Sequence, residues 1–415
     1  MAWELLDAMA RMLRIDLSPS SHDFPARSSP FCPKVEPFLP GGRRKGLLAN
    51  PACLVGRHVL AGMTLLAILA VAPSVRAQVT PAEGHTAADD TPVVKVGGTI
   101  FANFTYLEQP KILDVDGNQV NASSFDITRA YINVTGSIHH LVSYRITPDI
   151  LRETAAGLNV NGSLVIRLKY AYGQFNLDDS WSKGSWVRLG LQQTPYIDYD
   201  ESIYRYRFQG PTFTDVEKYL TSSDFGLSLH YNFPGNFGDV HGGIYDGDGY
   251  TKADANDEKA LQLRVSFRPV PNGGIIKGLR LTAFYDADHY ANNDDRTRLV
   301  GNMSFEHRYV NAAVEYLDAH DQPNAAAPDV HGEGYSVWVT PRSTIGIEGL
   351  LRYDSLKRNA DVDERTERRV AGIAYWFPIQ KPAAVSLMLD YEFVTFDDPA
   401  RPSEIRYALH SLFNF

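Results

Sequence analysis

Cysteine is almost absent from this 415-residue sequence, which contains only Cys32 and Cys53. A chain with no cysteine beyond residue 53 cannot depend on disulfide bonds over most of its length. Apolar runs of about 18 residues, which a membrane-spanning helix requires, are also absent. The motifs of serine hydrolases, zinc peptidases and nucleotide-binding loops do not occur. The sequence therefore predicts no helical membrane span, no catalytic residues, no cofactor and no metal site.

An apolar segment near the N-terminus has the layout of a secretory signal. Residues 59–72 (VLAGMTLLAILAVA) follow basic residues, and Val75-Arg76-Ala77 offers a small-residue cleavage pattern. We expect residues 1–77 to be a leader that is removed after export. Residues 1–58 are Pro-rich and without lasting periodicity, which indicates a start codon assigned too early or a long leader. A small N-terminal domain is the alternative.

Apolar and polar side chains alternate with a period of two from Val93 to the C-terminus. This spacing places one set of side chains on each face of a sheet. The first two such segments cover 94–106 and 125–138. The other fourteen centre on Tyr144, Leu168, Leu189, Leu227, Ile244, Leu263, Leu281, Met303, Val314, Val337, Ile347, Ala374, Leu389 and Leu409. We therefore predict an all-β fold, a transmembrane antiparallel β-barrel of about 16 strands over residues 93–415. A short periplasmic linker at 78–92 precedes it.

The connections between these segments alternate in length. Short ones, such as 139–140 and 341–343, alternate with longer acidic ones at 286–295, 318–329 and 354–364. Short periplasmic turns and long extracellular loops are typical of outer-membrane barrels. A soluble β-sandwich needs no such asymmetry. The predicted location is the bacterial outer membrane, with outer-membrane lipid as a partner.

The C-terminal segment places its aromatic residues on one face. That face carries Tyr407, Leu409, Phe413 and Phe415, while the other carries Arg406, His410 and Asn414. A soluble protein rarely ends on an exposed aromatic strand, because such an edge invites aggregation. The ending resembles the terminal signal read by the barrel-assembly machinery, although Ser411 departs from it. An edge strand of a soluble β-protein is the alternative.

One connection, residues 193–223, is both long and rich in aromatic residues. Such a loop is usually functional, and its aromatic content argues against disorder. We expect it to fold into the barrel and narrow it. The run YRYR is expected to be extended, so that Arg205 and Arg207 oppose Asp198, Asp200 and Glu201 across the constriction. A rim-covering loop or a trimer contact is the alternative.

Basic residues outnumber acidic ones on the predicted inner face. The basic set is Arg129, Arg145, Arg167, Lys169, Arg188, Arg264, Arg268, Arg280, Arg298, Arg352, Arg369 and Arg406. The acidic set is Asp286, Glu306, Glu315, Glu348, Asp390 and Glu392. Because cations in a narrow aqueous pore attract anions, this excess predicts a weak anion preference. Alternatively, the arginines balance acidic residues across the wall and stiffen it.

Two stretches resemble a known family. FDITRAYINVTGSI, which contains Arg129, and WVRLGLQQTPYIDYDESIYRYRFQG, which contains Gly190 and Pro195, are similar to the phosphate-selective porin O and P family. The resemblance implies a sixteen-stranded, homotrimeric channel for passive diffusion, and it does not settle the solute. We expect small anions or polar solutes, and no nucleic-acid partner.

Three classes of function remain open from the sequence: a diffusion porin, a plugged structural or adhesive barrel, and an outer-membrane lipolytic enzyme. The enzyme needs a Ser–His–Asp set on the outer wall. His410 and Ser411 are adjacent and so point to opposite faces. Neither the pair His139-His140 nor the Asp246-Gly-Asp-Gly run is predicted to bind a metal.

Overall fold

The structure is a computed structural model. It describes residues 90–154, 160–254, 256–291, 294–322, 324, 326–362 and 364–415. The predicted leader, and the predicted linker apart from residues 90–92, lie outside the described residues.

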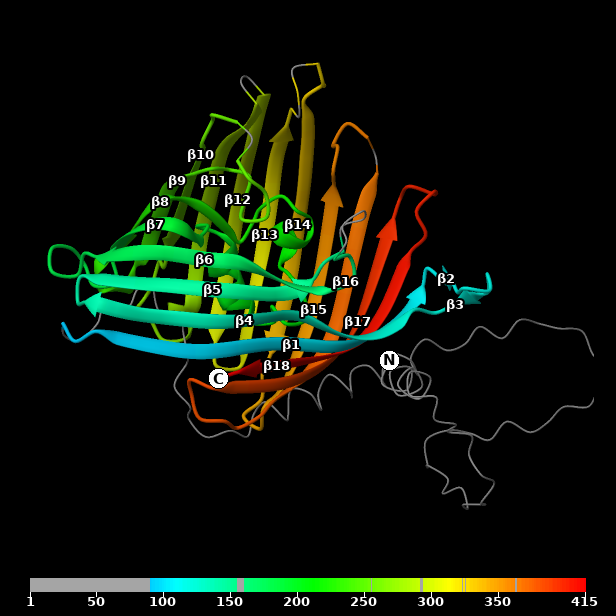
Figure 1. Ribbon diagram of the computed structural model, residues 1–415, viewed down its shortest axis with the longest axis horizontal. Helices are drawn as coiled ribbons and strands as arrows, with labels where there is room; N and C mark the ends of the chain where they lie inside the picture. Colours follow the sequence, from blue (N-terminus) through cyan, green and yellow to red (C-terminus); the bar gives the residue numbers. More distant parts are fainter. Residues whose placement is uncertain are drawn as a thin grey trace, which may run out of the picture. The chain divides into compact units, whose positions relative to one another are not determined.

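Sixteen antiparallel strands close into one barrel in this part of the chain (Figure 1). Each strand pairs with its neighbours in sequence, and the first and last strands complete the ring. The wall strands are β1 (Val93–Gln109), β4 (Ser123–His139), β5 (Val142–Arg152), β6 (Leu164–Asn176), β7 (Trp186–Gln193), β8 (Ser223–Asn232), β9 (Gly238–Tyr245), β10 (Ala260–Phe267), β11 (Leu279–Ala291), β12 (Asp294–His307), β13 (Val310–Asp321), β14 (Val330–Pro341), β15 (Ile347–Lys357), β16 (Arg365–Trp376), β17 (Ala384–Phe396) and β18 (Glu404–Asn414). The predicted fold class is confirmed, and every predicted segment falls on one of these strands.

Short elements occupy the connections. They are β2 (Ile112–Leu113), β3 (Gln119–Val120), α3 (Ile197–Tyr204), α4 (Phe213–Val216), η1 (Pro234–Asn236) and η2 (Ile275–Gly278). No helix among the described residues is long and apolar enough to cross a membrane, a finding that concerns helices alone.

The barrel closes where the C-terminal strand meets the first strand. β18 pairs with β1 along Thr99–Gln109. Beyond the end of β18, Phe415 and Gly98 exchange two backbone hydrogen bonds, with N···O distances of 2.8 and 2.9 Å. A free strand edge in lipid would leave backbone groups without partners, so this seam completes the wall.

The terminal side chains follow the strand alternation. Leu409, Phe413 and Phe415 are exposed on the outer face, and Tyr407 shares that face, where its ring contacts the ring of Tyr106. Ser411 also lies there and donates its hydroxyl hydrogen to the carbonyl oxygen of Ala102, at 2.9 Å. The polar departure in this strand therefore has a hydrogen-bond partner.

Alternation along the wall separates an apolar outside from a polar inside. In β10 the buried positions include Gln262, Arg264 and Ser266, whereas Leu261, Leu263, Val265 and Phe267 are exposed. An Arg or Lys facing lipid at mid-membrane would cost about 2–4 kcal/mol, which fixes the register of each strand.

Outward aromatic side chains gather at two levels of the wall. We call the level near the loop-bearing rim the tyrosine row; it consists of Tyr106, Tyr316, Tyr335, Tyr353, Tyr391 and Tyr407. The level near the short turns consists of Tyr231, Phe233, Phe237, Phe267, Tyr309, Tyr375 and Phe377. Aromatic rings at two levels mark the two membrane–water interfaces of a transmembrane barrel.

Three connections expected to be long are shorter in the structure. Strand pairing extends into the predicted loops, so that Asp286, Asp318 and Asp354 belong to β11, β13 and β15. Asp286 and Asp354 are buried on the inner face. The assignment of Asp354 to a loop is therefore wrong, whereas Asp286 lies on the inner face, as its place in the alternation predicts.

Substitutions at two outward glycines, Gly98 and Gly301, test the packing of Phe415 at the seam between β1 and β18. The outward position 98 is covered by the ring of Phe415, and a Cβ atom there would lie 2.5 Å from its Cζ. We expect Gly98→Val to displace that ring and to destabilise the barrel by about 1–3 kcal/mol. The matched control is Gly301→Val, since a Cβ atom at 301 would meet nothing within 4 Å. Urea unfolding of protein folded into lipid vesicles measures both, and equal losses would contradict this view of the seam.

Candidate functional site: an arginine-lined constriction

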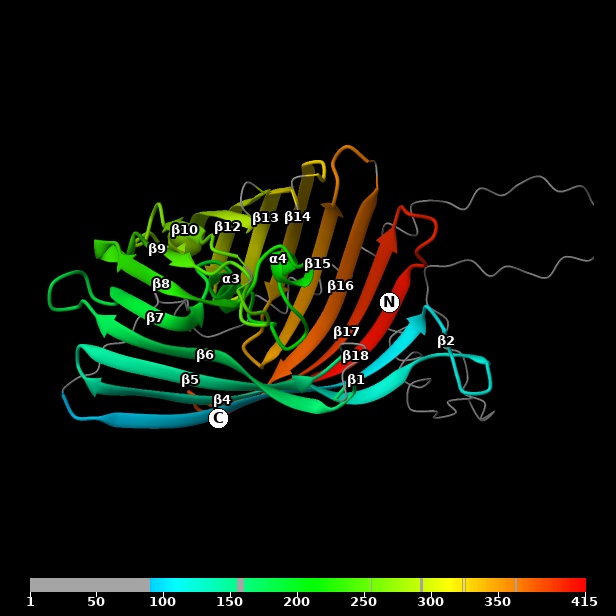
Figure 2. The same ribbon diagram turned by 45° about the horizontal axis from the view of Figure 1, so that its top comes forward.

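The connection between β7 and β8 lies inside the barrel (Figure 2). It carries α3 and α4, and its aromatic side chains pack on the inner wall. Tyr204 contacts Trp338 with ring centroids 5.3 Å apart, and Tyr196 contacts Phe284 at 5.4 Å. Burial of these rings holds the loop in place, because each removes a large apolar area from water.

Polar groups of the wall also bind the loop. The Tyr199 hydroxyl lies 2.6 Å from the hydroxyl of Thr282. Tyr206 donates its hydroxyl hydrogen to the carboxylate of Glu348, at 2.8 Å. The side-chain amide of Gln209 donates to Asp390, at 2.7 Å. Each such hydrogen bond contributes about 1 kcal/mol.

The predicted extended YRYR run is wrong. Residues 197–204 form α3, which ends at Arg205 with a left-handed φ of 68°. Arg205 then points to the wall, 3.4 Å from Glu348, whereas Arg207 turns back to Glu201, at 2.5 Å. The two arginines therefore do not share one side of an extended strand, because the chain turns at the left-handed helix cap Arg205 and again at residues 207–209.

The acidic residues of the loop are also placed differently from the prediction. Asp198 accepts a hydrogen bond from the hydroxyl of Tyr170 on β6, at 2.9 Å. Asp200 is buried 3.3 Å from the amide of Asn302, which lies on β12. Only Glu201 faces one of the two arginines. The loop therefore neutralises its charges locally instead of opposing them across the pore.

A cavity of about 460 Å³ lies between the loop and strands β1, β4 and β15–β18. Its charged lining is strongly unequal, with five arginines and one carboxylate. The charged lining residues are Arg129, Arg207, Arg352, Arg368, Arg406 and Glu392. The non-polar part of the lining includes Phe101 and Phe208. We call this space the arginine cavity.

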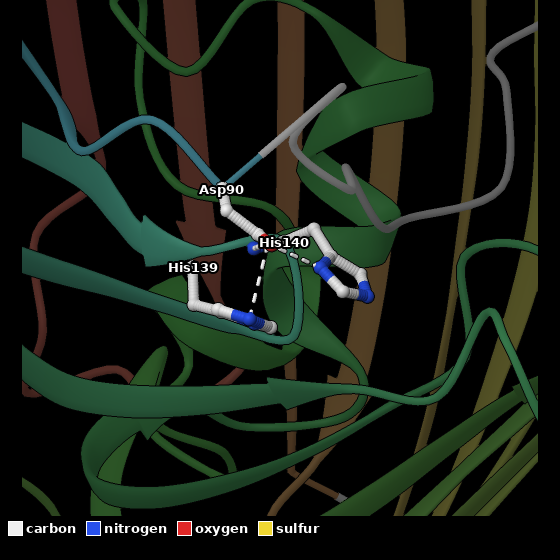
Figure 3. Close-up of side chains that lie close together, drawn as sticks. All are labelled: Asp90, His139 and His140. Carbon is white, nitrogen blue, oxygen red and sulfur yellow. Dashed lines mark hydrogen bonds and ion pairs between the residues drawn. The ribbon is translucent and has the colours of Figure 1, made fainter.

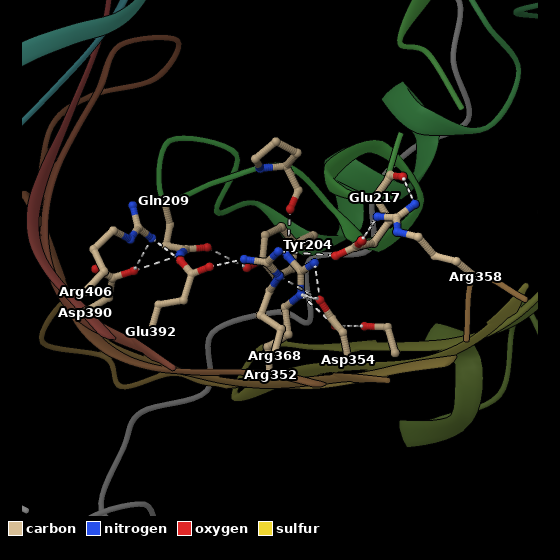
Figure 4. Close-up of polar contacts among 12 residues, drawn as sticks. Tyr204, Gln209, Glu217, Arg352, Asp354, Arg358, Arg368, Asp390, Glu392 and Arg406 are labelled. Atoms are coloured by element: carbon tan, nitrogen blue, oxygen red, sulfur yellow. Dashed lines mark hydrogen bonds and ion pairs between the residues drawn. The ribbon is translucent and has the colours of Figure 1, made fainter. Parts of the chain in front are cut away.

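Three of these arginines pair with carboxylates of the wall and the loop (Figure 4). Arg368 forms ion pairs with Glu392 and, at 3.2 Å, with Glu217 of the loop. Arg406 also pairs with Glu392, and it lies 3.5 Å from Asp390. The exposed fractions of the Arg368 and Arg406 side chains are 18% and 24%, against 12% for Glu392 and 0% for Asp390. Positive charge therefore faces the water.

On β4–β6, too, the arginines are more exposed than the carboxylate with which they pair. The buried carboxylate of Asp149 lies between Arg129, at 2.6 Å, and Arg167, at 3.1 Å. Both guanidinium groups are more exposed than this carboxylate. Arg145 lies over the ring of Tyr170.

Other predicted lumen residues are buried against the wall or the loop. Lys169 lies over the ring of Tyr131 on β4. Arg188 contacts Gln174 and Trp186. Three further buried arginines form ion pairs with acidic residues: Arg264 with Asp239, Arg280 with Glu306, and Arg298 with Asp321. Arg268 lies one residue beyond β10 and donates to Asn236. Arg352 pairs with Asp354 and donates to the Pro211 carbonyl oxygen, at 2.7 Å. These residues join the wall to its neighbours and to the loop.

The inward assignment of Arg369 is wrong. Its side chain is 45% exposed on the outer face, where it pairs with Glu367 and lies over the ring of Tyr353. The lumen residue is its neighbour Arg368. The sequence contains the information that places Arg369 outside. Ile373 and Tyr375 are apolar and outward, and Arg369 lies an even number of residues from both, so it faces the same way. Arg369 lies beside the tyrosine row, where a lipid-facing charge costs least.

Acidic residues on the inner face were undercounted. Five more are buried there: Asp149, Asp224, Asp239, Asp288 and Asp354. The numerical excess of twelve basic over six acidic residues is therefore wrong. What distinguishes the basic residues of the arginine cavity other than Arg352 is their partial exposure at the cavity surface, which no count of residues reveals.

Two groups of histidine and aspartate side chains lie outside the lumen: Asp90 with His139 and His140, and Asp318 with His320 and His331. In the first, His140 contacts Asp90 at 2.5 Å (Figure 3). His140 also contacts Asp179, at 2.9 Å. Hydrogen bonds to Asp90 and then to Asp179 raise the pKa of His140. Neither group was predicted, because pairing across strands and turns brings its members together.

Solved structures of the same fold are outer-membrane proteins. OmpT of Vibrio cholerae with loop L8 deleted has a TM-score of 0.54 and 13% identity, covering 79% of this chain and 100% of that one. The anion-selective porin from Comamonas acidovorans has a TM-score of 0.53 and 12% identity, covering 78% of this chain and 100% of that one. Salmonella typhi OmpF in complex with daunomycin has a TM-score of 0.52 and 14% identity, covering 78% of this chain and 97% of that one. No family model and no curated protein matches the sequence. Identities this low show a shared porin-like fold and nothing finer.

The Glu201–Arg207 pair predicts a pH response. Burial raises the pKa of Glu201 to about 7, and Arg207 opposes this rise. As the pH falls through 7, Glu201 loses its negative charge, and Arg207 keeps only its more distant carboxylate partner, Asp215 at 3.7 Å. We expect the preference for anions, measured as the zero-current potential in a salt gradient, to increase as the pH falls from 8.5 to 5.5.

The variant Glu201→Gln should remove this step. Since His410 also lines the arginine cavity, His410→Gln separates its contribution. A step that survives in Glu201→Gln and disappears in His410→Gln would contradict the assignment.

Proposed function

We propose that this chain is an outer-membrane porin for passive diffusion of small hydrophilic solutes, with a weak preference for anions. One observation carries the proposal: the charged lining of the arginine cavity consists of five arginines and one carboxylate, and Arg368 and Arg406 are more exposed than the carboxylates with which they pair. A fixed positive surface in a narrow aqueous space raises the local concentration of anions. The chain then catalyses no reaction.

The cellular setting belongs to this proposal. Two levels of outward aromatic side chains support a barrel in a bilayer, and an exposed C-terminal Phe415 supports insertion by the barrel-assembly machinery into the outer membrane. We further propose a homotrimer, and small anions such as phosphate as solutes. The resemblance of two sequence stretches to the phosphate-selective porin O and P family supports these two points.

A plugged structural barrel is the second candidate. It is favoured by the dense packing of the inward loop, whose residues Tyr196, Ile197, Ile203, Tyr204 and Tyr206 have no exposed surface. Recordings from the purified protein in a planar bilayer separate the candidates. Ohmic steps support the porin, whereas persistent silence with correctly folded protein supports the plugged barrel.

An enzyme on the outer wall gains little support from the terminal strand. His410 lies inside, 3.1 Å from Asp390, whereas Ser411 lies outside and donates to a backbone carbonyl. These two side chains cannot act on one substrate.

Adjacent arginines on β16 test the anion preference. Arg368→Gln removes a positive charge from the arginine cavity and leaves Glu392 and Glu217 less neutralised. We expect the anion-to-cation permeability ratio to fall roughly two- to eightfold, as a unit charge about 4–8 Å from the ions implies in water at physiological salt.

The control Arg369→Gln makes the same chemical change one residue away on the outer face, and the permeability ratio should not change. Zero-current potentials in a salt gradient measure both variants. A larger effect of Arg369→Gln would contradict the proposed register and the proposed role.

A further inference from the structure

Two histidines face each other on the outer side of the β13–β14 hairpin. His320 and His331 are directly opposite in the antiparallel ladder, and their ring centroids are 4.6 Å apart. Asp318 lies two residues before His320 and therefore on the same face. On the same outer face, Asp318 and Glu333 form the next opposite pair, and Tyr316 and Tyr335 of the tyrosine row form the pair after it. The group therefore lies beyond the membrane interface, at the loop-bearing rim.

The donor atoms of this group converge. The two carboxylate oxygens of Asp318 each face one imidazole nitrogen. Oδ1 is 3.4 Å from Nε2 of His320, and Oδ2 is 3.0 Å from Nε2 of His331. One donor atom from each of the three residues lies within 4.8 Å of the others. Ligands held tetrahedrally at 2.0–2.1 Å from a metal are separated by roughly 3.3–3.4 Å. The distances of 3.0 and 3.4 Å from the Asp318 oxygens to the two Nε2 atoms are close to this separation, and the χ2 angles of His and Asp are soft.

The surroundings of the group favour a cation. Nδ1 of His320 lies 3.6 Å from the carboxylate of Asp329, a partner that orients this ring with Nε2 towards Asp318. Glu333 is directly opposite Asp318 in the ladder. Like charges at opposite positions destabilise a strand pair, and a bound cation between them would relieve this repulsion.

We propose that Asp318, His320 and His331 bind a divalent transition metal ion such as Zn²⁺, Ni²⁺ or Cu²⁺. Two imidazoles and one carboxylate suit these ions, whereas Ca²⁺ and Mg²⁺ prefer six or more oxygen ligands. Three protein ligands leave at least one coordination position for water or an external ligand. The ion links the two strands at the base of the connection 322–329.

The second histidine group provides a matched comparison. In that group His139 and His140 are neighbours in sequence at the tight turn between β4 and β5, so no strand pairing holds the two rings opposite each other. The carboxylates around His140 also lie closer to its nitrogens, at 2.5 and 2.9 Å, than those around His320, at 3.4 and 3.6 Å. We therefore place the metal at the β13–β14 hairpin alone.

Metal titration of the purified, untagged protein tests the assignment. Isothermal titration with Zn²⁺ should show one dominant site per chain. The variants Asp318→Asn, His320→Ala and His331→Ala should each weaken binding by more than the ~10–100-fold that outer-shell changes cost. The electron paramagnetic resonance spectrum of bound Cu²⁺ should show two nitrogen ligands, and one in either single histidine variant.

Two controls make the result decisive. His139→Ala/His140→Ala removes the second group, and His289→Ala removes a single histidine that lies 3.1 Å from Asp295 on the neighbouring hairpin. Both should bind Zn²⁺ as the unmodified protein does. Heat-modifiable gel migration shows that each variant is folded. Absence of a dominant site, unchanged affinity in folded His320→Ala/His331→Ala, or an equal loss in His139→Ala/His140→Ala would overturn the proposal.

Discussion

Closure of the strand ring is the constraint on which the rest of the structure depends. A bilayer offers no water to backbone groups, so every strand needs two hydrogen-bonded neighbours. The seam between β1 and β18 supplies the final pairing, and the ring of Phe415 covers Gly98 beside it. Once the ring is closed, each side chain faces either lipid or lumen. The outer face is then apolar, and the charged residues of the strands must face the lumen or lie near the rims.

A polar lumen explains the position of the loop between β7 and β8. The inner wall supplies hydroxyl, amide and carboxylate groups, and the loop supplies tyrosines that combine an apolar ring with a polar tip. The wall beneath the loop includes buried ion pairs, such as Arg264 with Asp239. Arg129, Arg207, Arg368 and Arg406 at the arginine cavity differ because their side chains keep 18–24% of their surface exposed. Selectivity thus depends on which member of an ion pair is exposed.

The fold could be predicted from the sequence because period-two alternation can be recognised within each strand. A shift of one residue would move every side chain of a strand to the opposite face, so the apolar positions identify the outer face. The same rule explains the error at Arg369: a shift of one residue exchanges it with Arg368, and only the outward Ile373 and Tyr375 reveal the phase. The helix 197–204 was missed because tertiary contacts set its conformation. The pairing of His320 with His331 depends on register between strands, which residue spacing does not reveal.

The central claim is that the loop lies in a conducting lumen and that the water there meets positive charge. Gly210 lines the arginine cavity, a Cβ atom there would meet nothing within 4 Å, and the chain has no cysteine after residue 53. Single channels of Gly210→Cys can be treated with methanethiosulfonate reagents that carry a sulfonate or a trimethylammonium group. Both should reduce the conductance, and the anionic reagent should react roughly two- to fivefold faster. An unchanged conductance, or faster reaction of the cationic reagent, would contradict the account.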